Sequence, residues 1–129
     1  SSHRIMLVHG SPFRQNEYLT ADLPEEYLQE MMKAAGVDIL VCGHTHVPYH
    51  RRLVGGQHII NAGSIGKPKH GDARASYVII DLKDDTKKDI KESTKVEICY
   101  VDYDVELTAR TISQVGLPEE FALRLRQGI

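Results

Sequence analysis

The stretch VDILVCGHTHVPYH (Val37–His50) decides how this chain is organised. Its first part, Val37–Cys42, is an apolar run of the length and composition of a buried strand. The run ends at Gly43, and His44 and His46 follow with one threonine between them. Loops that leave the ends of buried strands often carry function. The sequence therefore predicts a functional site at the end of this strand.

A second histidine-bearing strand end is expected to lie beside the first. Arg4–Val8 is a short apolar run that ends at His9, and the segment 24–36, PEEYLQEMMKAAG, has the pattern of an amphipathic helix that begins at a proline and stops at a glycine. A strand, a helix and a strand in this order predict a parallel crossover unit. Because parallel strands end at the same edge of a sheet, we expect His9 to meet the histidine pair.

The remainder of the chain predicts further strands and two closing helices. Gly55-Gly56 marks a hairpin between Val47–Val54 and His58–Ile60, and 61–72 is a glycine-rich loop. Further strands are expected at Ala75–Leu82 and Lys95–Val101 with a charged connection at 83–94, and helices at 105–115 and 118–128. These elements predict one domain over residues 1–129 of the α/β (α+β) class, with a mixed β-sheet, a β-meander and two C-terminal helices.

Composition excludes several classes of protein. The chain has 129 residues, 41% of them hydrophobic, and a formal net charge of −2 from 16 basic and 18 acidic residues, so it lacks the electrostatic footprint of a nucleic-acid-binding protein. No apolar run approaches the roughly 18 residues of a membrane span, and no signal-peptide pattern opens the chain, so we expect a cytoplasmic protein. Cys42 and Cys99 do not form a CxxC motif and are expected to be buried free thiols.

The His-x-His spacing is compatible with metal ligation. In an extended chain, residues i and i+2 point to the same side about 6.6 Å apart, which would let His44 and His46 reach two metals separated by roughly 3.5–4 Å. Such a pair also occurs on ordinary exposed strands, and the spacing by itself leaves both interpretations open. His50 and His58 are expected to face solvent, because isolated polar strand residues usually do.

Several segments taken together resemble a known family. They are LVHGSP (7–12), GHTHVPYHR (43–51), INAGSIGKPKHGDARASYVIID (60–81) and VDYDVELTARTISQVGLPEEFALRLRQG (101–128). In this order they are similar to the C-terminal half of a calcineurin-like metallophosphoesterase, and most closely to the small bacterial predicted phosphodiesterases that include diadenosine tetraphosphate hydrolases. The resemblance implies half of an αββα sandwich.

The resemblance also implies a metal centre. His9 and His44 would ligate the second of two divalent metals (Mn, Fe, Zn or Ni), and His46 would ligate the first. The substrate would be a small phosphoester such as a nucleotide, attacked by a metal-bound hydroxide. Around the histidines, the secondary candidates for substrate or ligand support are Gly43, Asn61, Ser64 and Arg74.

The sequence departs from the family in its acidic ligands. Asp-x-His, Gly-Asp and Gly-Asn-His segments would be expected before His9, together with the general acid, and the Gly71-Asp72 pair comes in the wrong order to replace them. We therefore expect a C-terminal portion of the phosphoesterase domain that has little activity alone. It is expected to self-associate or to bind a complementing N-terminal half. The alternative is a non-catalytic protein-binding scaffold, as in the retromer scaffold subunit of this fold.

Overall fold

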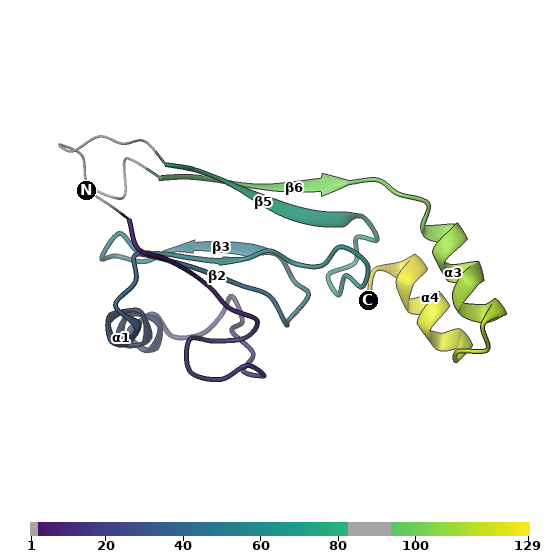
Figure 1. Cartoon of the computed structure of the whole chain (residues 1–129), viewed down its shortest axis with the longest axis horizontal. Coiled ribbons are helices and arrows are strands. Elements are labelled where there is room, and N and C mark those ends of the chain that lie inside the picture. The colour runs from purple at the N-terminus through teal and green to yellow at the C-terminus, as the bar shows by residue number, and fades with distance from the viewer. Residues whose placement is uncertain (1–2, 83–93) are drawn as a thin grey trace.

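Two sheets and three helices make up the computed structural model, which describes residues 3–82 and 94–129. Its elements are β1 (Ile5–Leu7), α1 (Glu25–Ala35), β2 (Ile39–Cys42), β3 (Tyr49–Arg52), β4 (His58–Asn61), β5 (Ala75–Leu82), β6 (Thr94–Val101), α3 (Val105–Gln114) and α4 (Glu119–Gln127). Figure 1 shows α1 on one side of the larger sheet, the β5–β6 hairpin on the other, and α3 and α4 at one end. The α/β class and the mixed sheet are confirmed.

The larger sheet contains the predicted crossover unit. Its strand order is β1-β2-β4-β3, with β1, β2 and β4 mutually parallel and β3 antiparallel to β4. Ile39 of β2 is in register with Ile5 on one side and with His58 on the other. The three parallel strands consequently end at one edge of the sheet.

The predicted β-meander is wrong in one respect. The strands form two hairpins, β3–β4 and β5–β6, but these belong to separate sheets. The reason is that β4 lies between β2 and β3, so both of its edges are already hydrogen-bonded and neither is open to β5. Of the predicted charged connection at 83–94, only Thr94 lies within the described residues, and it begins β6.

Helix α1 covers one face of the sheet through its predicted apolar side. Leu28, Met31 and Met32 are buried and pack with Leu40 and Ile59 of the sheet. Fully burying a side chain of this size contributes roughly 1.5–3 kcal/mol, so these contacts are sufficient to hold the helix in place. Both methionines are therefore core residues.

The C-terminal helices form a hairpin attached to the loop that follows β4. The Asp104 side chain caps α3 by accepting a hydrogen bond from the Leu107 amide at 2.8 Å. Small and apolar residues, Ala109 with Ala122 and Leu125, pack the two helices together. At the end of α4, the amide of Gly71 donates to the Gly128 carbonyl at 2.9 Å. This bond ties the helical hairpin to residues 61–72.

The prediction that His50 and His58 both face solvent is wrong for His58. His50 is exposed, whereas His58 is 1% exposed and its ring stacks on His50 with centroids 5.1 Å apart. The reason is the central position of β4, which is covered on both faces. Burial, assisted by the nearby charges of His50 and Arg52, lowers the pKa of His58 to about 4.

The two cysteines differ in burial. Cys42 is buried as predicted, and burial raises the pKa of its thiol to about 11, whereas Cys99 on β6 is only half-buried. Within residues 3–82 and 94–129, no helix is long and apolar enough to cross a membrane.

Candidate metal centre

The carboxyl ends of β1, β2 and β4 bring the predicted site together. His9 follows β1, the turn 43–46 follows β2, and Asn61 is the last residue of β4. Two backbone hydrogen bonds join the first two strand ends, from the Val8 amide to the Val41 carbonyl at 2.9 Å and from the Gly43 amide to the His9 carbonyl at 3.0 Å. The parallel register therefore places His9 against the GHTH turn, as the sequence predicts.

His9 and His44 are in direct contact. The Nε2 atom of His9 lies 2.9 Å from Nδ1 of His44, and the ring planes meet at 63°. The other ring nitrogen of His44, Nε2, is buried and has no hydrogen-bond partner. The ring of Tyr18 lies against His44 with centroids 4.2 Å apart. Nε2 of His58 is buried without a partner in the same way, so this feature alone does not distinguish a ligand, and the contact between His9 Nε2 and His44 Nδ1 is the one that a metal could replace.

His46 is oriented by the loop that follows β4. Its Nδ1 atom lies 2.7 Å from the backbone carbonyl oxygen of Lys67. Because a carbonyl can only accept, Nδ1 carries the proton and Nε2 keeps its lone pair. A histidine whose second nitrogen donates to a backbone carbonyl is the usual arrangement for a metal ligand. His46 therefore has a ligand's tautomer and orientation.

The expected extended geometry of the histidine pair is wrong. His44 has φ of 64° and His46 has φ of 60°, so both adopt the left-handed conformation that non-glycine residues seldom occupy. The chain therefore does not run straight between them, and their rings contact different partners, His9 and the Lys67 carbonyl. Each left-handed residue costs roughly 1 kcal/mol or more, and such strain is concentrated at functional sites.

Asn61 holds this strained turn in place. Its Nδ2 atom donates to the Gly43 carbonyl at 2.7 Å and to Thr45 Oγ1 at 3.0 Å, and its Oδ1 atom accepts from the Gly63 amide at 2.9 Å. The side chain is fully buried. Asn61, predicted to line the site edge, is thus the brace between the GHTH turn and the loop that follows β4.

The remaining candidates have different environments. A Cβ atom on Gly43 would make only an ordinary 3.7 Å contact with the His9 carbonyl oxygen, so the tight turn is at the two histidines instead. Ser64 Oγ accepts from the Lys67 amide at 2.8 Å and so helps to position the carbonyl that holds His46.

Arg74 pairs with Asp72 at 2.6 Å and lies over the Tyr100 ring. The charge of Arg74 is already partnered, and it lowers the pKa of Asp72 to about 2.

Comparison with known proteins places the chain in a family. The calcineurin-like phosphoesterase superfamily domain matches residues 1–85. The chain belongs to this superfamily. A curated relative, an uncharacterized protein of Methanocaldococcus jannaschii, is 28% identical over 141 residues, which cover 97% of this chain and 52% of that protein.

Two solved structures share the phosphoesterase fold along nearly the whole chain. A metallophosphoesterase from Sphaerobacter thermophilus has a TM-score of 0.76 and 26% identity, covering 100% of this chain and 57% of that one. A hypothetical protein from Pyrococcus horikoshii has a TM-score of 0.79 and 24% identity, covering 98% and 47%. The chain therefore spans about half the length of the proteins it matches.

The calcineurin-like phosphoesterases typically use divalent metals, and the histidines fit part of such a centre. Two imidazole nitrogens on one tetrahedral zinc lie about 3.4 Å apart, given Zn–N bonds of about 2.0–2.1 Å. The 2.9 Å contact between His9 and His44 would therefore open by about half an ångström to admit a metal in place of a proton. Within the described part of the chain, no group of three His, Cys, Asp or Glu side chains is arranged to hold a metal ion.

Two contributors to the site were not predicted from the sequence. Tyr18 lies in a polar segment without periodicity, and nothing there indicates that its ring covers His44. At Lys67, the backbone carbonyl and not the side chain orients His46. A backbone contact of this kind leaves no residue-type signal in a sequence.

Proposed function

We propose that this chain supplies the histidine side of a dinuclear phosphoesterase centre, with His9, His44 and His46 as ligands to Mn, Fe, Zn or Ni. The observation that carries the proposal is the convergence of His9 and His44, whose nitrogens lie 2.9 Å apart at the ends of two parallel strands. The anchored ring of His46 supports it, because this ring presents Nε2 as a ligand would. The substrate is a small phosphoester.

The chain's own residues would hold and orient the ligands. Bound divalent metals supply two things in this chemistry, water acidified to near neutral pH and neutralisation of charge on phosphoryl oxygens. Asn61 fixes the strained turn, and the Lys67 carbonyl fixes the proton of His46 on Nδ1. These contacts keep the imidazoles in place before a metal arrives, which lowers the cost of ordering them.

The acidic ligands of the centre would come from outside the described residues, through self-association or through a complementing N-terminal half. The exposed edge of the larger sheet supports this proposal. β1 pairs with β2 alone in the described structure, and its Leu7 and Ile5 side chains are 77% and 41% exposed. Unpaired edge strands with exposed apolar residues are sites where another strand pairs. Without the added ligands, we expect little phosphodiesterase turnover from this chain.

Calorimetric titration of the chain with Zn²⁺ and Mn²⁺ tests the proposal. We expect weak binding that falls at least tenfold in His9→Ala and in His46→Ala, because each variant removes one ligand. His50→Ala is the matched control, since His50 is an exposed histidine on β3 that contacts His58 and not the strand-end histidines. Equal affinity in all four proteins would refute the assignment.

A non-catalytic scaffold is the second candidate. It is favoured by the exposed apolar β1 edge and by the lack of a three-ligand cluster among the described residues. The two candidates differ in one measurable property. A scaffold would bind a protein partner equally well in wild type and His44→Ala without any metal. The phosphoesterase, once its acidic ligands are supplied by the complementing half, would need metal and His44 to cleave bis-p-nitrophenyl phosphate.

A further inference from the structure

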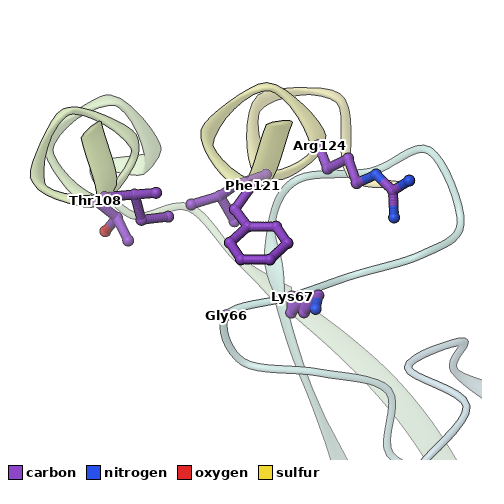
Figure 2. Close-up of a pocket in the computed structure, with 7 residues that line it drawn as sticks. Gly66, Lys67, Thr108, Phe121 and Arg124 are labelled. Atoms are coloured by element: carbon purple, nitrogen blue, oxygen red, sulfur yellow. The ribbon is translucent and has the colours of Figure 1, made fainter. Parts of the chain in front are cut away.

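A cavity of about 200 Å³ lies between the loop that follows β4 and the two C-terminal helices (Figure 2). Apolar side chains form most of its wall, and two cationic residues border it. Its lining includes Gly66 and Lys67 of the loop, Ile112 of α3, and Phe121, Arg124 and Leu125 of α4. Pockets for drug-sized ligands usually measure about 300–1,000 Å³. This cavity is therefore large enough for one ring system and too small for an entire nucleotide.

Lys67 joins the cavity to the metal centre. Its backbone carbonyl holds His46 at 2.7 Å, while its side chain lines the cavity. Ser64 fixes the Lys67 amide at 2.8 Å, and the Gly71–Gly128 bond fixes the end of α4 against the same loop. A ligand seated in the cavity would consequently lie beside the segment that orients a proposed metal ligand.

Phe121 gives the cavity its chemical character. Its ring points from α4 toward Gly66 and Lys67 (Figure 2), and the residue is 42% exposed. The Lys67 ammonium lies 5.5 Å from the ring centroid, within the range of a cation–π contact. The guanidinium of Arg124, by contrast, is paired with Glu120. Within residues 3–82 and 94–129, the cavity therefore combines one aromatic surface with one cation, Lys67, that is not paired with a carboxylate.

We propose that this cavity binds the aromatic ring of an anionic phosphoester substrate, a nucleobase or an aryl group, while Lys67 contacts the phosphate. The assignment rests on the proposed function and adds the substrate class to it. An apolar wall with an exposed phenyl ring favours a planar ring over a sugar, whose hydroxyls would lose water without gaining partners. The adjacent ammonium matches the negative charge of the phosphate.

Binding of three probes by calorimetry or by amide chemical shifts tests this assignment: AMP, ribose 5-phosphate and inorganic phosphate. AMP should bind about fivefold more tightly than ribose 5-phosphate, the low end of the range for stacking a base on an aromatic side chain. Phe121→Ala should remove that advantage and leave phosphate binding unchanged. Lys67→Gln should weaken all three, since it removes the charge and keeps the backbone carbonyl.

Leu123→Ala is the matched control, because Leu123 is 49% exposed on the same helix and does not line the cavity. It should bind AMP as wild type does. If AMP and ribose 5-phosphate bind equally, or if Leu123→Ala weakens AMP as much as Phe121→Ala, the cavity assignment is overturned. Such a failure can be told apart from failure of the proposed function. If only the cavity assignment fails, zinc binding still depends on His46. If only the metal centre fails, AMP binding still depends on Phe121, and metal binding does not depend on His46.

Discussion

Two pairs of histidines in the described structure have nearly the same nitrogen separation and differ in their backbone surroundings. His9 and His44 lie 2.9 Å apart at the strand ends, and His50 and His58 lie 2.8 Å apart on β3 and β4. The first pair meets at 63° beside a strained turn, whereas the second is stacked at 8° with His58 buried in the sheet. The contact between two imidazoles is thus not what defines a site. The backbone around it decides whether the pair can take a ligand.

The largest expected effect comes from the brace that distinguishes the strand-end pair. Asn61→Ala should lower the free energy of unfolding by about 2–4 kcal/mol, because it leaves the buried Thr45 hydroxyl, the half-buried Gly43 carbonyl and the half-buried Gly63 amide without this partner. Urea denaturation followed by circular dichroism measures the change. A loss below about 0.5 kcal/mol would show that the GHTH turn holds itself without this side chain.

The buried pair, His50 and His58, should make the free energy of unfolding depend on pH. Because the pKa of His58 is lowered to about 4 from its usual value near 6.5, the unfolded chain binds the proton more readily than the folded chain. His58 therefore leaves the free energy of unfolding unchanged above about pH 6.5. As the pH drops from there toward 4, the free energy of unfolding falls by about 2–3 kcal/mol.

Urea midpoints between pH 4 and 7.5 measure this loss, and His58→Leu provides the comparison. Leucine fills a similar volume and cannot take a proton, so the pH profile of His58→Leu should be flatter than that of wild type. Identical slopes in the two proteins would mean that some other group causes the acid sensitivity.

The strand-end pair should contribute less to stability than the buried pair. His9→Gln should change the free energy of unfolding by no more than about 0.5 kcal/mol, because His9 is exposed and its contact with His44 is a single hydrogen bond. The same variant should bind zinc at least tenfold more weakly. A large loss of stability with unchanged metal affinity would assign His9 a structural role.

The smallest effect is expected at Arg74. Its guanidinium is already paired with Asp72 and lies over Tyr100, so Arg74→Gln should change metal and phosphate affinity by less than twofold. Calorimetry with zinc and with inorganic phosphate checks this. If Arg74→Gln binds phosphate at least fivefold more weakly than wild type, Arg74 does contribute to the phosphate site.

The sequence predicted the individual helices and strands better than it predicted which strands pair with one another. The helix over α1, the strand Ala75–Leu82 and the two C-terminal helices follow from local patterns, and the structure confirms them. The separation of the two hairpins did not follow, because it depends on β4 being placed between β2 and β3, a long-range pairing that no local pattern encodes.

The site was predictable to a similar extent. Strand order brings His9 to His44 as expected, because both follow parallel neighbouring strands. The left-handed backbone of His44 and His46 was not predictable, since only the Asn61 hydrogen bonds from the end of β4 make it tolerable. Where tertiary contacts impose strain, residue-type patterns indicate the wrong geometry.

The central claim is that the strand-end histidines, and not the buried pair, are metal ligands. Long-range ¹H–¹⁵N spectra of the imidazole nitrogens during a zinc titration test it most directly. The proposed centre predicts that the resonances of His9, His44 and His46 shift together while those of His50 and His58 stay unchanged. Zinc-dependent shifts at His50 and His58, with none at the strand ends, would contradict it.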